Sequence, residues 1–239
     1  MSSAPVTPSS QKAAALYDPA YARRYRAYDD EVQHGGPYRS FAEWLAQVCG
    51  LFVPPIDVLD LGCGTGRYFW ALSGVRNLVG IDASAAMLVE ARHPLHADRI
   101  TAEVVTLVQG DLLSYDFQAG QFDLIYSIGV LAEHAPLDAA VAAHVWRWLR
   151  AGGRFAFTTV HPASPSIPPT LPRRIGRALD RVLPAPLARP LRDRLLAGGL
   201  YADERWIMDL LTAFEIETLR QFDSEAHRHC WCVARKRAA

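Results

Sequence analysis

The chain has 239 residues, of which 50% are hydrophobic and 21% are charged. This composition supplies enough apolar surface for a full core and too little charge for a disordered chain, and the length suits one domain. The 25 basic and 25 acidic side chains cancel. Net charge therefore gives no indication of binding to nucleic acid or to an acidic membrane surface.

The amino-terminal segment MSSAPVTPSSQK lacks the apolar stretch of a secretory signal. No run approaches the ~18 uncharged apolar residues of a membrane span. The 4 cysteines are few and irregularly spaced, which is typical of reduced thiols. We therefore expect a cytoplasmic protein without a membrane span, with a flexible tail at residues 1–12 and one domain at 13–239.

Two helices are expected first along the chain. Tyrosines at positions 17, 21, 25 and 28 recur at helical spacing and predict an aromatic stripe. In the next segment, SFAEWLAQVCG, Ser40 is in place for an N-cap, Glu43 for a capping box and Gly50 for a helix stop.

From residue 54 onward, short apolar runs alternate with helical ones. Strands are predicted at 54–62, 77–82, 102–111, 122–129 and 154–160, and helices at 67–74, 84–93 and 136–153. A helix at 202–214 and two strands at 215–224 and 228–237 close the chain. This alternation predicts an α/β fold with a doubly wound, mostly parallel, seven-stranded sheet and an antiparallel carboxyl-terminal edge strand.

The alternation of strands and helices ends at residues 161–200, where prolines interrupt short helical patterns. We expect this segment to be a lid inserted after the fifth strand. Its 173–194 stretch contains seven arginines and two aspartates, which fits a solvated amphipathic lid, an anionic-substrate or acyl-carrier surface, or a lipid contact. Nucleic acid is not expected as a partner, because no aromatic interleaving accompanies the arginines.

The stretch DLGCGTG at residues 60–66 ends the first of the alternating strands. A strand, a glycine-rich turn and a helix place backbone N–H groups beside a ligand, although glycines also occur in tight turns that bind nothing. The dinucleotide fingerprint is G-x-G-x-x-G, whereas the spacing here is G-x-G-x-G after Asp60. A carboxylate would repel a pyrophosphate, so Asp60 favours a ligand that carries an ammonium group.

The motif VLDLGCGTGR resembles the first motif of the class I S-adenosylmethionine-dependent methyltransferases. Four further stretches resemble later motifs of that superfamily in the same order: VGIDAS, VQGDLL, FDLIYSIGVLAEHAP and LRAGGRFAFTTV. The resemblance covers residues 54–160 strongly and 200–237 weakly. It implies a Rossmann-like fold, S-adenosyl-L-methionine as cofactor and S-adenosyl-L-homocysteine as product.

The resemblance also implies cofactor-binding residues. Asp60 is expected to hold the amino group over a loop that includes Gly62, Cys63, Gly64 and Gly66, with Cys63 a small filler. Asp82 would accept the ribose hydroxyls, a feature that fits NAD equally well. Asp111 and Leu112 would contact the adenine. Further cofactor contacts are expected from Ala83, Met87 and Ser127, and from Tyr17 and Tyr25 of the aromatic stripe, which is otherwise a packing face.

Methyl transfer mainly needs alignment of the two reactants, so a catalytic side chain is not required for every acceptor. His161 follows a predicted strand end and is a candidate base or substrate contact. His134 and Glu133 follow the preceding strand. His134 is a candidate for substrate contact or catalysis, with helix-entry packing or hydrogen bonding as the alternative, and Glu133 is a candidate substrate contact.

No metal site is expected. The stretch HRHCWC at 227–232 lies on a predicted strand, where neighbouring side chains point to opposite faces, and no second ligand pair with zinc spacing accompanies it. We expect O-, N- or C-methylation of a small-molecule acceptor. The alternatives are an RNA or protein methyltransferase and a module that binds the cofactor without catalysis. The oligomeric state stays open.

Overall fold

A computed structural model of the chain describes residues 15–33, 35–166, 201–224 and 227–237, together with positions 175, 178, 179, 182–184 and 187. The expected tail at 1–12 and most of the expected lid at 161–200 lie outside the described residues. Within the described ranges, no helix combines the length and the apolar character that crossing a bilayer would require.

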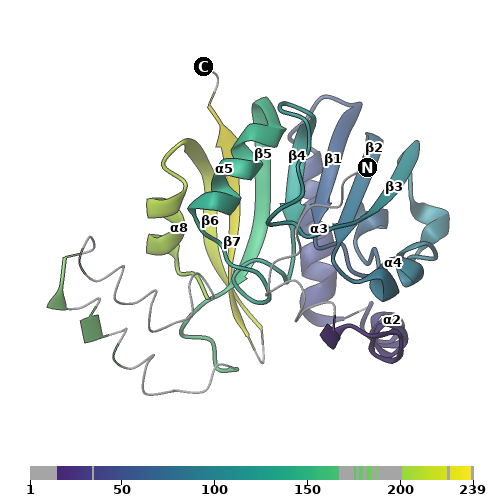
Figure 1. Cartoon of the computed structure of the whole chain (residues 1–239), viewed down its shortest axis with the longest axis horizontal. Coiled ribbons are helices and arrows are strands. Elements are labelled where there is room, and N and C mark those ends of the chain that lie inside the picture. The colour runs from purple at the N-terminus through teal and green to yellow at the C-terminus, as the bar shows by residue number, and fades with distance from the viewer. Residues whose placement is uncertain are drawn as a thin grey trace.

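A seven-stranded sheet with the order β3-β2-β1-β4-β5-β7-β6 forms the centre of the molecule (Figure 1). Its strands are β1 Ile56–Leu61, β2 Val75–Asp82, β3 Val104–Gln109, β4 Phe122–Ser127, β5 Leu149–Val160, β6 Phe214–Asp223 and β7 Arg228–Lys236. The first five strands pair in parallel, and β7 pairs antiparallel with both β5 and β6. The predicted mostly parallel sheet is confirmed, with the antiparallel strand one position inside the edge.

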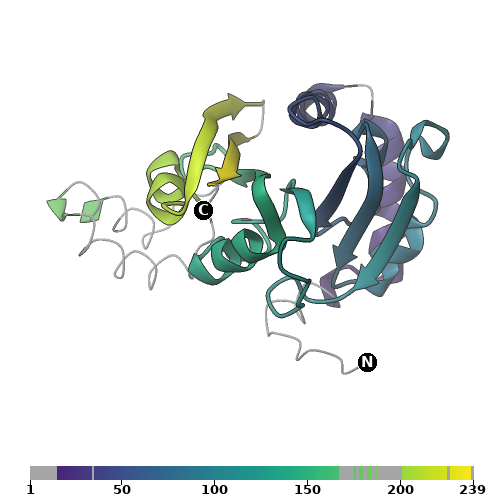
Figure 2. The ribbon, with the colours of Figure 1, turned by 90° about the horizontal axis from the view of Figure 1, so that it is seen from above.

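Helices cover both faces of the sheet (Figure 2). They are α2 Pro19–Val32, α3 Gly36–Cys49, α4 Ala85–Ala91, α5 Ala139–Trp148 and α8 Glu204–Leu210, with 3-10 turns η1 Phe69–Ala71 and η2 Ala97–Arg99. Every residue of β1 is buried, and its side chains alternate between two cores. Leu59 packs in the core that includes α5 and α8, and Val58 packs in the core that includes α3. This double burial explains the continuous apolar character of the strand.

Three predicted helices differ from the observed ones. The helix expected at 67–74 is only the short turn η1, because the chain returns to β2 at Val75 through Gly74, which has φ of 65°. The helix expected at 136–153 ends at Trp148, since Leu149 already has extended backbone angles and opens β5. Ser40 is not an N-cap: α3 begins at Gly36 with a proline in its first turn.

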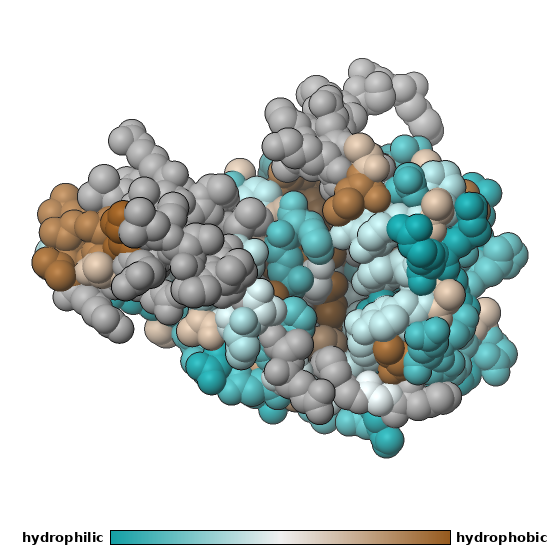
Figure 3. Space-filling view, turned by 90° about the horizontal axis from the view of Figure 1, so that it is seen from below, coloured by the Kyte–Doolittle hydropathy of each residue, from teal (hydrophilic) through white to brown (hydrophobic). Residues whose placement is uncertain are grey.

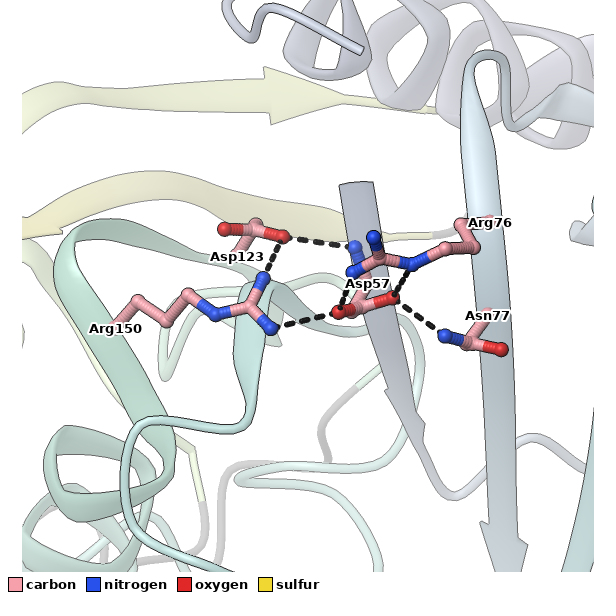
Figure 4. A network of polar contacts seen from close by, with 5 residues as sticks. All are labelled: Asp57, Arg76, Asn77, Asp123 and Arg150. Carbon is pink, nitrogen blue, oxygen red and sulfur yellow. Dashed lines mark hydrogen bonds and ion pairs between the residues drawn. The ribbon is translucent and has the colours of Figure 1, made fainter. Parts of the chain in front are cut away.

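An ion-pair network joins the amino ends of four adjacent strands (Figure 4). Asp57 of β1 accepts hydrogen bonds from Arg76 and Asn77 of β2 and from Arg150 of β5. Arg150 also binds Asp123 of β4, whose carboxylate accepts the Asp57 backbone N–H at 2.8 Å. The network fixes the edge of the sheet opposite to the glycine turn, which follows the carboxyl end of β1.

Candidate functional site

Three glycines shape the turn that follows β1. Gly62, Gly64 and Gly66 have positive φ angles of 79°, 54° and 73°, in the left-handed region that other residues rarely adopt. The backbone N–H groups of Gly62 and Cys63 donate to the Ile81 carbonyl at 2.9 and 3.0 Å. These bonds hold the turn against the end of β2, so its bare backbone borders the space beyond both strands.

Two carboxylates flank this turn, that of buried Asp60 and that of partly buried Asp82. The Asp60 carboxylate accepts a hydrogen bond from the Tyr126 hydroxyl at 2.6 Å. Burial raises the pKa of Asp60 to about 8, the Tyr126 bond opposes this shift, and neighbouring Asp82 adds to it. The Asp82 carboxylate accepts the backbone N–H groups of Gly64 and Ser84 at 2.9 and 2.8 Å, and burial raises its pKa against the effect of these bonds. A cationic group near Asp60 would favour its ionised form.

A cavity of about 350 Å³ opens beside the two carboxylates. Small-molecule sites commonly have volumes of about 300–1,000 Å³, so the cavity falls within that range. Its wall is formed by the amino-terminal segment, the glycine turn, the ends of β2 and β4, and the start of β7. The space-filling view from below, toward the edge where α2 lies, is hollowed near its centre (Figure 3).

The amino-terminal segment bridges two parts of this wall. Tyr17 precedes α2, and its carbonyl accepts a hydrogen bond from the Ser84 hydroxyl at 2.7 Å. The Tyr17 hydroxyl lies 3.2 Å from Nε2 of His134, which follows β4. Tyr21 packs edge-on against Tyr17 and stacks on Tyr25. Tyr17, Tyr21 and Tyr25 of the predicted aromatic stripe therefore line the cavity, although Tyr17 itself lies outside the helix; Tyr28, the fourth member, is exposed and is not part of the wall.

A buried ion pair attaches α2 to the glycine turn. Asp29 is 1% exposed, and its carboxylate accepts the Thr65 hydroxyl at 2.6 Å and pairs with the Arg67 guanidinium. That guanidinium lies over the rings of Tyr25 and Tyr38, 4.6 and 4.3 Å from their centroids. Arg67 lines the cavity, so the same group holds α2 in place and contributes to the wall.

The connection after β4 supplies two titratable groups. Glu133 and His134 both line the cavity, in a turn that Ala132 makes possible with φ of 61°. Burial raises the pKa of Glu133 to about 7 and lowers the pKa of His134. At neutral pH, His134 is therefore an uncharged imidazole, and Glu133 is close to the midpoint of its titration.

The structure places most of the predicted cofactor residues in this wall: Asp60, Gly62, Cys63, Gly64, Asp82, Ala83, Met87, Leu112, Tyr17 and Tyr25. Gly66, Asp111 and Ser127 are not part of it. Asp111 accepts the backbone N–H of Leu113 at 2.9 Å. The Ser127 hydroxyl donates to the Leu61 carbonyl at 2.9 Å, so it points to the strand backbone and not to the cavity.

His161 also lies outside the cavity wall. Its Nε2 is 3.5 Å from the Glu204 carboxylate, and with Cys230 these residues form a group whose ligand-type atoms lie within 4.8 Å of one another. However, Nδ1 of His161 accepts the Ala163 N–H at 3.0 Å, which leaves the ring proton of the neutral imidazole on Nε2. A metal would need that nitrogen unprotonated, so the geometry favours a polar contact between β5 and α8 over a metal site.

Sequence reasoning missed the part of the wall that lies away from Asp82. It is lined by Tyr38, Phe41, Arg67, Tyr68, Thr158, His227 and His229. These residues come from α3, the glycine turn, β5 and the start of β7, and no local pattern links them. His229 is buried in this wall, and burial lowers its pKa to about 4. The only available signal was Arg67, which directly follows the glycine motif.

Comparison with known proteins identifies a methyltransferase domain at residues 58–153. Malonyl-(acyl-carrier protein) O-methyltransferase of Enterobacter lignolyticus is 37% identical over 113 residues, which are 46% of this chain and 41% of that protein. An S-adenosylmethionine-dependent methyltransferase from Mesorhizobium loti has a TM-score of 0.57 at 24% identity, over 82% of this chain and 98% of that one.

The cyclase SpnF has a TM-score of 0.67 at 15% identity over the full length of both chains. At these identities the two structures show a shared fold alone. The chain spans less than half the length of the curated relatives it matches.

Proposed function

We propose that this chain is a class I S-adenosylmethionine-dependent methyltransferase, which transfers a methyl group from S-adenosylmethionine to a small-molecule acceptor; the methyltransferase domain matched at residues 58–153 supports the proposal. The observation that carries the proposal is the placement of Asp60 and Asp82 beside the glycine turn in one cavity wall. The cofactor supplies a methyl group that is already activated on a sulfonium, and S-adenosylhomocysteine is the product.

The residues at the glycine turn fit the functional groups of this cofactor. The turn presents backbone without side chains, and the Asp60 carboxylate is available to an ammonium group. The Asp82 carboxylate accepts backbone N–H groups, yet a carboxylate has about four lone-pair sites, so it can still accept a hydrogen bond from the ribose. Leu112 and Met87 would pack on the adenine, and Asp111 would shape the turn that carries Leu112.

Catalysis in this site would rest on alignment and exclusion of water. Tyr17 closes the wall between Ser84 and His134. Neutral His134 can accept a proton from a hydroxyl or nitrogen of the acceptor. We propose that His161, outside the wall, instead holds the chain that leaves β5 near α8.

The cavity volume of about 350 Å³ supports a small acceptor over RNA or a protein chain, and we place the reaction in the cytoplasm. One relative is named for methyl transfer to an oxygen of a malonyl-acyl-carrier protein.

Calorimetry with S-adenosylhomocysteine tests the cofactor site directly. The variant Asp82→Asn should weaken binding by about 1–3 kcal/mol, or roughly 5- to 150-fold, because ribose hydroxyls would lose a charged acceptor. The exposed carboxylate of Asp98 provides a control, and Asp98→Asn should bind as the natural chain does. Equal affinity in both variants would show that Asp82 does not contact the cofactor.

Transfer of label from methyl-tritiated S-adenosylmethionine to a broad acceptor panel tests the reaction. Label in a small-molecule product supports the proposal. Tight binding of S-adenosylhomocysteine with no transfer to any acceptor would instead favour a cofactor-binding module without methyl transfer.

A further inference from the structure

Glu133 differs from the other buried acids of the described structure. Asp29 has Thr65 and Arg67, Asp57 has its arginines, Asp60 has Tyr126, and Asp111 has the Leu113 N–H, while partly buried Asp82 has two backbone N–H groups. The Glu133 carboxyl has no hydrogen-bond or ion-pair partner among the described residues, and its Oε1 is buried. A buried acid without a partner costs several kcal/mol when it is ionised, so proteins rarely keep one without a use.

Among the described residues of the wall, no Lys or Arg is free to pair with Glu133. Arg67 is the one Lys or Arg among the described residues of the wall, and it already pairs with Asp29. His134 and His229 have pKa values that burial lowers, so both stay neutral near pH 7. The wall thus holds three carboxyl groups, those of Asp60, Asp82 and Glu133, against one neutralised guanidinium.

Glu133 shares the cavity wall with Tyr17, Tyr21 and Tyr25. Its carboxylate contributes to raising the pKa values of Tyr17 and Tyr25, after burial and nearer tyrosines, which places it within electrostatic reach of both hydroxyls. Aromatic faces attract organic cations electrostatically, most strongly where water is excluded. A carboxylate beside tyrosine rings is therefore a combination suited to an ammonium group.

We propose that Glu133 binds a protonatable amino group of the acceptor, so that the acceptor is an amine and the methyl group goes to nitrogen. This inference rests on the proposed methyl transfer and names its substrate class. The raised pKa of Glu133, about 7, supports it, because such a group can take up a proton near neutral pH.

The chemistry balances with this residue as the proton acceptor. The bound ammonium gives one proton to the Glu133 carboxylate and becomes a neutral amine with a free lone pair. That lone pair forms the new N–C bond while the C–S bond breaks, and the bonding electrons stay on sulfur, which becomes a neutral thioether. The methylated nitrogen leaves as an ammonium.

Equilibrium binding to the S-adenosylhomocysteine complex tests the proposal with three probes of one shape: 2-phenylethylamine, 2-phenylethanol and phenylacetate. The natural chain should bind the amine most tightly. Glu133→Gln should weaken amine binding by at least about 30-fold, the effect of removing one partner of a buried charge pair, and leave the alcohol unchanged. Glu133→Asp, which keeps the charge, should retain part of the preference.

A matched control is Glu217→Gln, which changes a partly buried glutamate of β6 that Arg154 already pairs at 2.7 Å. It should leave all three probe affinities unchanged. Transfer of label from the tritiated cofactor should also favour amines over alcohols and carboxylates. Glu133→Gln should lower kcat/KM for the amine acceptors.

Three results would overturn the proposal. One is equal binding of amine and alcohol by the natural chain, and a second is unchanged amine binding in Glu133→Gln. The third is a loss of affinity for S-adenosylmethionine but not for S-adenosylhomocysteine, which would assign Glu133 to the sulfonium. Transfer confined to alcohols or carboxylates would leave the methyltransferase proposal standing and refute this one, whereas loss of cofactor binding and of all transfer would refute both.

Discussion

Asp60 shows how one residue responds to its surroundings. Its pKa in the folded chain, about 8, lies above the ordinary value of 3.8 because the carboxyl is buried. The folded chain therefore holds a proton that the unfolded chain releases. The stabilisation from this proton is complete below pH ~4 and is lost as the pH rises through about 8.

Cofactor binding should reverse this shift and release a proton from Asp60. An ammonium group beside the carboxylate favours its ionised form, so at pH 7 close to one proton should leave the complex. Calorimetry of S-adenosylhomocysteine binding in buffers of different ionisation enthalpy measures that number. In Asp60→Asn the release should disappear, and an unchanged release would mean that the amino group binds elsewhere.

Residue roles could be predicted only where a residue belongs to an ordered motif. Asp60 and Asp82 each end a strand at a fixed point of the pattern, and both lie in the cavity wall. Ser127 also ends a strand, yet its hydroxyl turns to the Leu61 carbonyl. A short side chain at the end of a strand can face the ligand cavity or a neighbouring strand. Which of the two it faces depends on the neighbouring strand, and a local sequence pattern does not specify that neighbour.

A buried ion pair and a hydrogen bond attach helix α2 to the glycine turn. Its buried Asp29 meets Thr65 and Arg67 of the glycine turn, while Ser84 holds the carbonyl of Tyr17 just ahead of the helix. The element that covers the cavity is thus fastened at the same turn that borders it. We expect the docking of α2 and the shape of the wall to change together.

Asp29→Asn should destabilise the chain by about 3–5 kcal/mol, because the Arg67 guanidinium would stay buried without its counter-charge. The free energy of unfolding in urea measures this effect. The adjacent Asp30 is the natural control: its side chain is 56% exposed and pairs with Arg26. Asp30→Asn should lower the free energy of unfolding by less than about 1 kcal/mol. Similar losses of stability in both variants would contradict a stabilising role for the buried Asp29–Arg67 pair.

Elements were predicted best where both faces are buried. The five parallel strands follow from their continuous apolar runs, since such runs suit a sheet covered by helices on two sides. The missing helix at 67–74 shows the limit of this reasoning. Its sequence is helical in pattern, but β1 and β2 pair from Ile56 and Val75 onward, and the short connection leaves room only for η1.

The two ends of the parallel strands have different electrostatic properties. At the amino edge, Asp57 joins four neighbouring strands through Arg76, Asn77 and Arg150 (Figure 4). Burial alone would raise the pKa of Asp57, but these hydrogen bonds outweigh it and lower the pKa to about 2. At the carboxyl edge, the acids Asp60 and Glu133 have raised pKa values instead. The amino ends of the strands therefore stabilise the ionised form of their acid, and the carboxyl ends favour the protonated form of theirs.

Asp57→Asn should therefore reduce stability without changing cofactor affinity. The pKa of about 2, against an ordinary 3.8, corresponds to roughly 1–2 kcal/mol after allowance for the partly exposed arginines. This contribution should be present above pH ~4 and be lost as the pH falls through about 2. Urea unfolding and calorimetry measure the two effects, and weaker S-adenosylhomocysteine binding would show that the edges are coupled.

The sequence by itself determined the sheet, the glycine turn and the acids that end β1 and β2. These features follow from periodicity and from backbone angles that only glycine adopts easily, and both are local properties. The tertiary structure decided which side chains share the cavity. Tyr17 and His134 lie 117 positions apart, and the isolation of the Glu133 carboxyl depends on every group that surrounds it. A missing partner has no sequence signature, because it is a property of the packed molecule.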